Sequence, residues 1–397
     1  MLVMAISSLS ETVHVHGGNT LNCTDADTFV SDFLGEHDVL LVAGRHSYEK
    51  SGAERLIEPH LKGRKVVRVS DFTVNPQIED LEKALKIISE TSISRIIAVG
   101  GGSALDMGKL ANFFTSSGSY PYEYLRGTVQ NPPEKFMPLL AIPTTAGTGS
   151  EATHFAVLYA ESIKYSIAAP QLRPSHVLLN AEFTRSLSPF QAACSGFDAL
   201  AHAIESLWAV SATTESRRHS LDALKLILRS LIVNVKNSDQ RSRFDMMKGA
   251  FLAGKAINDA KTTAAHALSY SLTAHENLPH GQAVSIFLPS VARVNVERML
   301  ENDSNLRDVA RILLDQFNSK TARDLEKNLC EIRNEIGLDN PDLPKSNCGL
   351  DHVCRRIEKE VNIDRLTNNP IMLSSDELRS IIKNGLEIGE VKSDKTR

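Results

Sequence analysis

Cysteine is scarce in this sequence, and the few cysteines are poorly spaced for a shared bond or metal ion. The five cysteines are scattered along 397 residues, and no two of them form a CxxC pair. Such a set indicates neither a disulfide framework nor a thiolate zinc site. We therefore expect a reducing compartment, the cytoplasm.

Long apolar stretches and runs of basic residues are also missing. Residues 1–8 are apolar but too short for the apolar core of a signal peptide, so we interpret them as a first strand or a frayed end. No segment indicates a membrane protein. With a net charge of −4 and no Lys/Arg run, the chain lacks the electrostatic footprint of a protein that binds nucleic acid or anionic lipid.

The composition is that of a globular protein. Hydrophobic residues make up 42% and charged residues 23%, close to the averages for soluble folded proteins. A chain of 397 residues exceeds the usual size of one hydrophobic core. We therefore expect two domains.

The first half alternates short, β-rich apolar runs with longer amphipathic stretches, the pattern of a parallel sheet flanked by helices. Apolar residues between 78 and 88 recur at helical spacing behind Asn75 and Pro76, a helix-start signal. The expected strands are residues 39–43, 65–69, 95–99, 137–142 and 176–179.

After about Pro189 the apolar residues recur at three and four positions, as in residues 223–235 and 244–257, which predicts a helical bundle. We expect an α/β domain over 1–189 and an all-helical domain over 190–397. Residues 337–349 are expected to form a loop, and the charged tail from Glu390 to be frayed.

The sequence has no GxGxxG motif, but two small-residue loops follow expected strands. Gly100, Gly101, Gly102 and Ser103 lie between a strand and a helix, where bare N–H groups can cradle an anion. We expect Ser103 to cap that helix with Asp106 as its capping-box partner. A tight turn that only packs the helix on the sheet is the alternative.

The second loop, PTTAGTGSE at 143–151, also follows an apolar strand and offers many hydroxyl and backbone donors. Two such loops at the carboxyl edge of a parallel sheet suit a dinucleotide. A cluster of Ser/Thr turns is the alternative for this loop. No carboxylate follows the strand at 39–43, where Arg45 could pair with a 2′-phosphate, so NADPH is as admissible as NADH.

Asp198 and His202 are four residues apart in a strong helix-forming stretch, so both project from one helix face and could share a cation. A local ion pair is the alternative. His266 and His280 would lie about 21 Å apart on one continuous helix. Pro279 interrupts that helix, so His280 can approach from another segment. One carboxylate and three imidazoles would suit Fe2+ or Zn2+.

Four motifs together resemble the iron-containing (group III) alcohol dehydrogenases: GGGSALDMGK (100–109), IPTTAGTGSEAT (142–153), FDALAHAIES (197–206) and HALSYSLTAHENLPHG (266–281). The resemblance spans nearly the whole chain. It implies an N-terminal dinucleotide-binding domain with a parallel sheet, an all-helical C-terminal domain as in dehydroquinate synthase, and a metal bound by Asp198, His202, His266 and His280. It also implies a homodimer.

The resemblance assigns cofactor binding to one set of positions. Lys164 matches a lysine that the family places near the nicotinamide, although a lysine at a strand edge is ordinarily only solvated. The full set is Asn75, Gly101, Gly102, Ser103, Asp106, Thr144, Thr145, Thr148 and Lys164.

Two departures from the family pattern bear on the substrate. Tyr270 stands where many members have a second histidine, and Lys261-Thr262-Thr263 replaces a glycine-rich stretch. With the segment 205–217, these features resemble the phosphonoacetaldehyde reductases, which make 2-hydroxyethylphosphonate. Lys261 and Thr262, with Ile257, are the candidate substrate contacts, since a phosphonate needs cationic and hydroxyl donors. Lys261 pointing to solvent is the alternative.

The expected reaction is reduction of a small aldehyde by NADPH or NADH, with the metal polarising the carbonyl. Tyr270, His275 or a water would then supply the proton. One rival in the same family is a dehydrogenase of a simple alcohol, diol or hydroxyacid. Another is a lyase of the dehydroquinate-synthase type, which would show no net nicotinamide oxidation.

Overall fold

The structure, a computed structural model, describes residues 12–16, 26–128, 136–161, 163–301, 305–339 and 349–387. The chain divides into two compact units. The first contains residues 1–145 and 150–186, and the second contains residues 146–149 and 187–397. The expected first strand or frayed end at 1–8, the tail from Glu390 and residues 340–348 of the expected loop lie outside the described residues.

The first unit is built on a six-stranded sheet in the order β1-β8-β5-β4-β2-β3, and every pairing in it is parallel. A separate antiparallel hairpin pairs β6 with β7. The strands are β1 (Thr12–His16), β2 (Val39–Ala43), β3 (Val66–Val69), β4 (Arg95–Gly100), β5 (Leu139–Pro143), β6 (Phe155–Ala160), β7 (Ile163–Ala168) and β8 (His176–Asn180).

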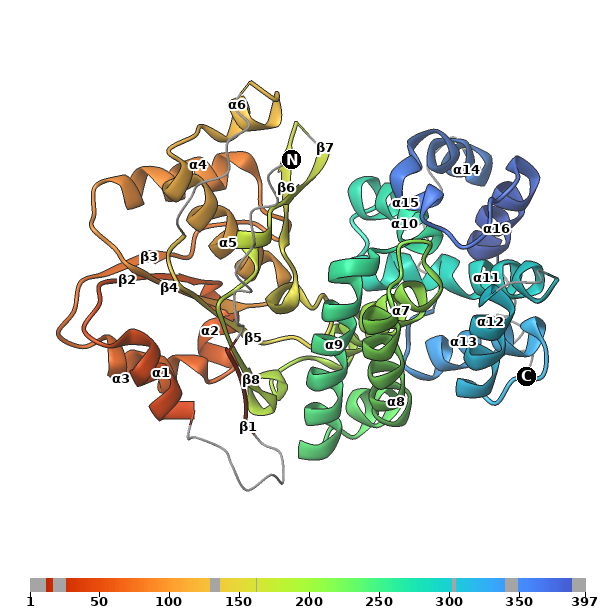
Figure 1. The fold of residues 1–397 in the computed structure, drawn as a ribbon, viewed down its shortest axis with the longest axis horizontal. Helices are drawn as coiled ribbons and strands as arrows, with labels where there is room; N and C mark the ends of the chain where they lie inside the picture. Colours follow the sequence, from red (N-terminus) through yellow and green to blue (C-terminus); the bar gives the residue numbers. More distant parts are fainter. Residues whose placement is uncertain are drawn as a thin grey trace, which may run out of the picture. The chain divides into compact units, whose positions relative to one another are not determined.

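Helices cover both faces of this sheet (Figure 1). Alternate strand residues point to opposite faces, so Leu40 and Ile96 pack with the apolar sides of α4 and α5, whereas Leu41 and Ile97 pack with α1 and α3. The helices of this unit are α1 (Ala26–Leu34), α2 (Arg45–Lys50), α3 (Ala53–Leu61), α4 (Ile78–Ser89), α5 (Gly102–Ser117) and α6 (Pro121–Leu125). Three 3-10 turns, η1 (Ser150–Ala152), η2 (Pro170–Leu172) and η3 (Ala181–Thr184), complete it.

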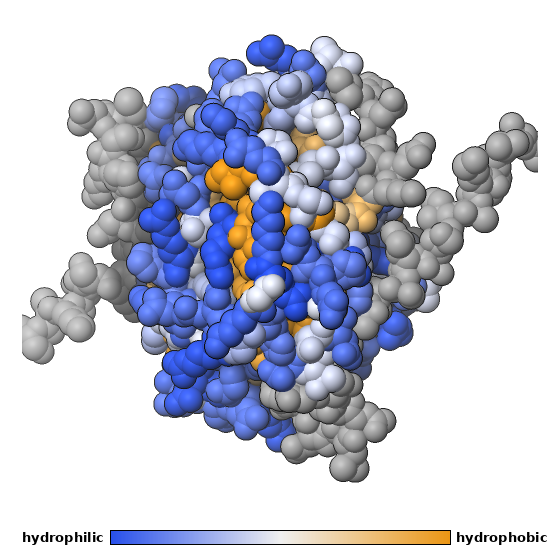
Figure 2. Space-filling view, turned by 90° about the vertical axis from the view of Figure 1, so that its left-hand side faces the viewer, coloured by the Kyte–Doolittle hydropathy of each residue, from blue (hydrophilic) through white to orange (hydrophobic). Residues whose placement is uncertain are grey.

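The edge strand β3 carries a charged residue on its exposed side. Arg68 pairs with Glu58 at 2.8 Å, and such a charge discourages pairing with another chain. The face of the molecule in Figure 2 is mostly hydrophilic, with hydrophobic side chains along a strip near its middle.

From residue 187 on, the described residues of the second unit form helices and their connections, with no strand. Helices α7, α8 and α9 pack on one another, and α11 packs on α7, α10 and α13 (Figure 1). The helices are α7 (Pro189–Trp208), α8 (Thr214–Lys236), α9 (Gln240–Ala260), α10 (Ala264–His275), α11 (His280–Leu300), α12 (Asn305–Gln316), α13 (Ala322–Glu335), α14 (Gly349–Glu360), α15 (Ile363–Thr367) and α16 (Ser375–Glu387). The expected fold class, a parallel α/β unit followed by a helical unit, is confirmed.

Across the described part of the chain, no helix combines the length and apolar character needed to cross a membrane.

Candidate metal centre and nucleotide loops

Helix α7 presents two of the expected metal ligands. Ser188 begins the helix with a capping box to Gln191, and Pro189 occupies the first turn, where its missing N–H is not needed. Asp198 and His202 follow one turn apart, and both side chains are buried. The four-residue spacing therefore places a carboxylate and an imidazole on the same helix face.

The other two histidines come from separate helices, as the break at Pro279 requires. His266 lies in the first turn of α10, and His280 is the first residue of α11, directly after the N-cap Pro279. Gly281 allows α11 to begin against α7, because a Cβ at this position would lie 1.9 Å from the carbonyl oxygen of Cys194. This close approach brings His280 to Asp198.

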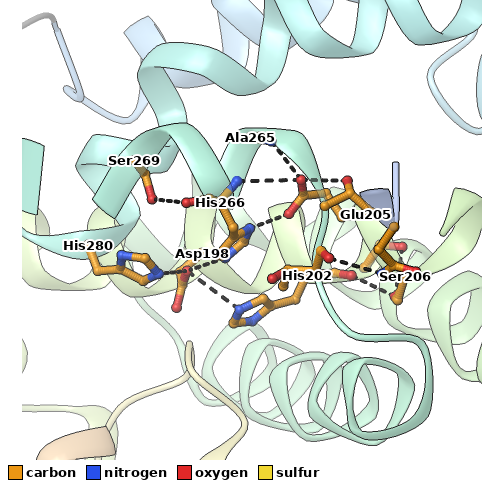
Figure 3. A network of polar contacts seen from close by, with 12 residues as sticks. Asp198, His202, Glu205, Ser206, Ala265, His266, Ser269 and His280 are labelled. Atoms are coloured by element: carbon orange, nitrogen blue, oxygen red, sulfur yellow. Dashed lines mark hydrogen bonds and ion pairs between the residues drawn. The ribbon is translucent and has the colours of Figure 1, made fainter. Parts of the chain in front are cut away.

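The structure brings all four expected ligands together around one carboxylate oxygen (Figure 3). Asp198 Oδ1 lies 3.4 Å from His266 Nε2, 3.8 Å from His202 Nε2 and 3.9 Å from His280 Nε2. Ligands about 2.1 Å from one tetrahedral ion lie about 3.4 Å apart. Within the part of the chain that the structure describes, the ligand atoms of Asp198, His202 and His266 all lie within 4.8 Å of one another, as a shared cation requires, whereas His280 is outside this group and approaches Asp198 Oδ1 to 3.9 Å.

Three buried polar atoms of this cluster lack hydrogen-bond partners among the described residues: Asp198 Oδ1, His202 Nδ1 and His266 Nε2. This is costly unless another species satisfies them. Burial alone would raise the pKa of Asp198, but the neighbouring histidines outweigh it and hold that pKa well below its usual range. The carboxylate is therefore charged and ready to bind a cation.

The histidines respond to burial and to the nearby carboxylates in opposite ways. Burial lowers the pKa of His202 to about 4, so this imidazole is neutral. Burial also disfavours charge on His266, but Glu205 and Asp198 outweigh it and raise the pKa of His266 to about 10. The cluster thus favours a positive charge between two carboxylates.

Glu205 is a site residue that the sequence reading did not single out. It is fully buried, and its carboxylate accepts a short hydrogen bond from His266 Nδ1 (Figure 3). Its other oxygen accepts from Thr263 Oγ1 at 2.7 Å and from the backbone N–H of Ala265 at 2.9 Å. One side chain of α7 therefore caps α10 and orients a candidate ligand on it.

A signal for Glu205 was present in the sequence. It lies three residues after His202 and seven after Asp198, so all three side chains share one face of α7. A carboxylate at this spacing could also lie on a solvated helix surface. The spacing alone therefore does not distinguish a site residue from a surface residue.

The two small-residue loops begin side by side in the first unit. The carbonyl oxygen of Gly100 accepts a hydrogen bond from the N–H of Thr144 at 2.9 Å, because β4 and β5 are neighbours. Helix α5 begins after the N-cap Gly101, and Gly102 is its first residue. The N–H groups at this helix start are the expected anion cradle.

The expected capping box at Ser103 is wrong. Gly101 is the N-cap of α5, and no side chain caps the helix. Ser103 lies inside the first turn, where its hydroxyl accepts a hydrogen bond from the N–H of Asn75 at 3.0 Å. The glycines shift the helix start by two residues, since they adopt the extended cap conformation without a side-chain acceptor.

Asp106 is partly buried and bonded within the unit. It accepts from Ser150 Oγ at 2.5 Å and from the N–H of Val157 at 3.0 Å. Lys109, one turn later, donates to Ser150, to Thr153 and to the carbonyl oxygen of Phe155. These bonds fasten α5 to the second loop and to the hairpin.

The remaining expected cofactor residues are distributed over several elements. Asn75 adopts a left-handed conformation before α4. Thr144 and Thr145 follow β5 in the first unit, whereas Thr148 belongs to the segment 146–149 of the second unit. Lys164 lies on β7, and its charge contributes to lowering the pKa of Asp106, although burial, the largest influence, raises that pKa overall.

Arg45 begins the short helix α2 and lies 3.5 Å from Asp71, which follows β3. Both side chains are exposed, so the pair is weak. The sequence reading did not anticipate this carboxylate beside Arg45.

The two candidate proton donors occupy different surroundings. The ring of Tyr270 stacks on that of His280, with centroids 5.8 Å apart. His275 lies at the other end of α10, about 13 Å along the helix axis from His266, and is 3.1 Å from Glu360 of α14. Of the two, only Tyr270 lies beside a candidate ligand.

The candidate substrate residues lie at the connection of α9 to α10. Ile257 is buried on α9, and its carbonyl oxygen accepts from the N–H of Lys261 at 2.9 Å. Lys261 is exposed, whereas Thr262 is buried. His266 begins four residues after Thr262, so this connection leads directly to the cluster.

A parallel α/β unit followed by a helical unit with an Asp/His cluster is the architecture of a class of nicotinamide-binding metalloenzymes that includes dehydrogenases and the dehydroquinate-synthase lyases. Residues 18–181 match the family model described as iron-containing alcohol dehydrogenase. Residues 192–386 match the C-terminal model of the Fe-containing alcohol dehydrogenase family. The chain belongs to the iron-containing alcohol dehydrogenase family.

Curated relatives match over part of their length. Long-chain-alcohol dehydrogenase 1 of Geobacillus thermodenitrificans is 36% identical over 261 residues, which are 65% of this chain and 66% of that enzyme. Alcohol dehydrogenase 4 of Saccharomyces cerevisiae is 32% identical over 56% of this chain and 59% of that protein. The matched stretches thus span less than two thirds of these relatives.

Solved structures match over nearly the whole chain. A sulfoacetaldehyde reductase from Bifidobacterium kashiwanohense, in complex with NAD+, has a TM-score of 0.81 at 26% identity and covers 95% of this chain and 97% of its own. An iron-containing alcohol dehydrogenase from Thermotoga maritima has a TM-score of 0.78 at 25% identity, covering 95% and 98%.

Proposed function

We propose that this chain reduces an aldehyde to a primary alcohol with a nicotinamide dinucleotide and one divalent metal ion. The observation that carries the proposal is the convergence of His202, His266 and His280 on Asp198. Asp198 Oδ1 and His266 Nε2 are buried there and have no hydrogen-bond partner in the described part of the chain. A divalent iron or zinc ion in this cluster would supply Lewis-acid polarisation of the aldehyde oxygen. In this proposal the helical unit is the metal-binding domain.

The chain's own residues hold and orient the reacting groups. Glu205 fixes the ring of His266, and the buried surroundings of Asp198 and His202 limit access of water. We assign the proton transfer to Tyr270 because its ring lies beside His280. His275 stays a weaker candidate, since Glu360 holds it at the far end of α10.

We propose that the first unit binds the dinucleotide. Its two loops are adjacent at the carboxyl ends of β4 and β5, the edge at which parallel sheets bind such ligands. Both NADH and NADPH stay candidates, because Arg45 is exposed and could bind a 2′-phosphate, although Asp71 lies 3.5 Å from it. The proposed contacts are Asn75, Gly101, Gly102, Ser103, Asp106, Thr144, Thr145, Thr148 and Lys164.

Our best candidate for the substrate is phosphonoacetaldehyde, reduced to 2-hydroxyethylphosphonate. The neighbour whose name identifies a sulfoacetaldehyde reductase supports an aldehyde with an anionic end. Lys261 and Thr262, with Ile257, are the proposed contacts of that end. The alternative is a simple alcohol, diol or hydroxyacid as substrate, as expected from relatives named alcohol dehydrogenases.

A nicotinamide-oxidation assay across an aldehyde panel tests these proposals. We would compare phosphonoacetaldehyde, sulfoacetaldehyde and acetaldehyde, with Fe2+ or Zn2+ and with NADH or NADPH. We expect the highest kcat/KM with an anionic aldehyde. A preference for acetaldehyde would overturn the substrate assignment, and no nicotinamide oxidation with any member would favour the lyase.

The role of Tyr270 has its own test. We expect Tyr270→Phe to lower kcat about a hundredfold and to alter its pH dependence, because a positioned proton donor contributes on this scale. Unchanged turnover and pH profile would assign the ring to packing. His275→Gln serves as the comparison on the same helix and is expected to have a smaller effect.

The expected homodimer belongs to the same proposal, and light scattering of the purified protein would test it.

A further inference from the structure

Lys261 has a backbone conformation that suits glycine and not lysine. It ends α9 with φ 58° and ψ −178°. This combination is almost exclusive to glycine, because a Cβ atom crowds the backbone there. A side chain at this position is therefore retained against a conformational cost.

Asn368 bonds the carbonyl groups of the two residues on either side of Lys261. Its Nδ2 donates to the carbonyl oxygen of Ala260 at 2.8 Å and to that of Thr262 at 3.0 Å. Its Oδ1 accepts from Ser211 Oγ at 2.8 Å and from the N–H of Ser211 at 3.1 Å. Three segments therefore meet at Lys261: the α7–α8 connection with Ser211, the α9–α10 connection with Lys261 itself, and the end of α15 with Asn368. We call the hydrogen bonds of Asn368 and Ser211 around Lys261 the clasp.

The downstream side of the same loop is held as firmly. Thr263 accepts a hydrogen bond from Trp208 Nε1 at 3.0 Å and donates to Glu205, the carboxylate that orients His266. A strained residue persists only where its surroundings fix it from several sides. The bonds of Asn368 and Thr263 meet that condition on both sides of Lys261.

The side chain that this arrangement presents is a cation. Lys261 is exposed in the helical unit, and it makes no ion pair within the described residues of the chain. It lies five residues before His266 along the chain, at the connection that leads into the metal cluster. Strain at such a position is often associated with function.

We infer that Asn368, with Ser211, is a specificity-determining positioning residue that fixes Lys261 as the contact for an oxyanion at the far end of the aldehyde substrate. The inference rests on the proposed function and deepens it, since it names the class of substrate as aldehydes that carry a phosphonate or sulfonate. Asn368 acts through Lys261 and does not touch the substrate.

The strain is tested by comparing Lys261→Gly with Lys261→Ala. Both variants remove the charge, but only glycine relieves the backbone. We expect Lys261→Gly to melt about 2 °C or more above Lys261→Ala and above the wild type. Equal melting temperatures for the two variants would overturn the assignment of strain.

The positioning role is tested with Asn368→Asp, which keeps the shape of the side chain and removes the Nδ2 donor. We expect the ratio of kcat/KM for phosphonoacetaldehyde to that for acetaldehyde to fall about tenfold, as for a weakened charge-assisted contact. Asn369→Asp is the matched control, because the neighbouring Asn369 bonds Asn295 and not the Lys261 loop. An unchanged ratio in Asn368→Asp, or an equal fall in the control, would overturn the inference.

Binding of methylphosphonate, measured by calorimetry, separates this inference from the proposed function. Lys261→Ala and Asn368→Asp should each weaken binding about tenfold, and the measurement needs no turnover. If the wild type fails to reduce phosphonoacetaldehyde but these changes still weaken binding, only the proposed substrate is wrong. If the wild type reduces phosphonoacetaldehyde and neither change alters methylphosphonate binding, the clasp is not a specificity device.

Discussion

At the scale of single residues, Glu205 links the metal cluster to the start of α10. Its carboxylate accepts hydrogen bonds only, so it keeps a proton on Nδ1 of His266. Without a metal the raised pKa keeps Nε2 protonated as well, toward Asp198, whereas a bound metal would take the place of that second proton and leave the tautomer with its only proton on Nδ1. A histidine that binds a metal needs this tautomer. The acid therefore sets which nitrogen is available as a ligand.

We predict that Glu205→Gln weakens the binding of Zn2+ or Fe2+ by roughly 10 to 100 fold. The amide oxygen can still accept from Thr263 and Ala265, but the amide NH2 would face Nδ1 of His266 and favour the tautomer with the proton on Nε2. Equilibrium dialysis with metal analysis would measure the change.

Ser206→Ala is the control for this substitution. Ser206 is the next residue on α7 and equally buried, and its hydroxyl bonds Ser220 and the carbonyl oxygen of His202 rather than His266. We expect the metal affinity of this variant to stay near that of the wild type. Equal losses in both variants would indicate general damage to α7.

Lys109 is a second buried charged residue, and its hydrogen bonds serve the stability of the first unit. Burial lowers the pKa of its ammonium to about 8, and three oxygen acceptors surround it. We predict that Lys109→Met lowers the free energy of unfolding by about 3 kcal/mol, because Asp106 loses its cationic neighbour in a buried site. Chemical denaturation would measure the loss, and Lys109→Met with Asp106→Asn should recover part of it.

At the scale of elements, the position of α11 depends on Gly281. We predict that Gly281→Ala displaces the start of α11 from α7, since the new Cβ would overlap the carbonyl oxygen of Cys194. Overpacking of this kind costs about 1 to 3 kcal/mol, and the shift should move His280 away from Asp198. Melting temperature and metal affinity should therefore fall together.

Gly337→Ala provides the comparison, because Gly337 has φ 74° and no heavy atom near its would-be Cβ. This change should lower stability through backbone strain alone. Metal affinity that fell as much in Gly337→Ala as in Gly281→Ala would contradict the assigned role of Gly281.

The regular elements were more predictable than their connections. The expected strands at 39–43, 95–99 and 176–179 differ from β2, β4 and β8 by no more than one residue at an end, because buried parallel strands are continuous apolar runs. The sequence did not predict β1, a short strand that carries two histidines, or the half-exposed hairpin of β6 and β7. β1 and β7 lack the continuous apolar run that marked the others, whereas β6 has one and was passed over.

The site was predictable where spacing along one helix decides the geometry, and less so where distant segments meet. Asp198 and His202 share a helix face by their spacing alone. The contact of Asn368 with the Lys261 loop joins residues more than 100 positions apart, and no local pattern encodes it. Ser103 was misplaced because three glycines in a row leave the first helical residue undetermined.

At the scale of the whole molecule, all four candidate ligands belong to the helical unit. We predict that a chelator lowers the melting temperature of this unit and leaves that of the α/β unit unchanged. Metal at 100 times its Kd would contribute about 2.7 kcal/mol to the folded state. Scanning calorimetry with and without added metal would show it, and equal shifts in both transitions would contradict the prediction.

The segment 146–149 lies within the first half of the chain but packs as part of the helical unit, with Gly149 against Gly254 of α9. A single cut near residue 187 would therefore leave the C-terminal fragment without a piece of its own interior. Neither unit is one continuous stretch of the sequence. A chimaera that combines one unit with a unit of another protein would therefore need more than one junction in the chain.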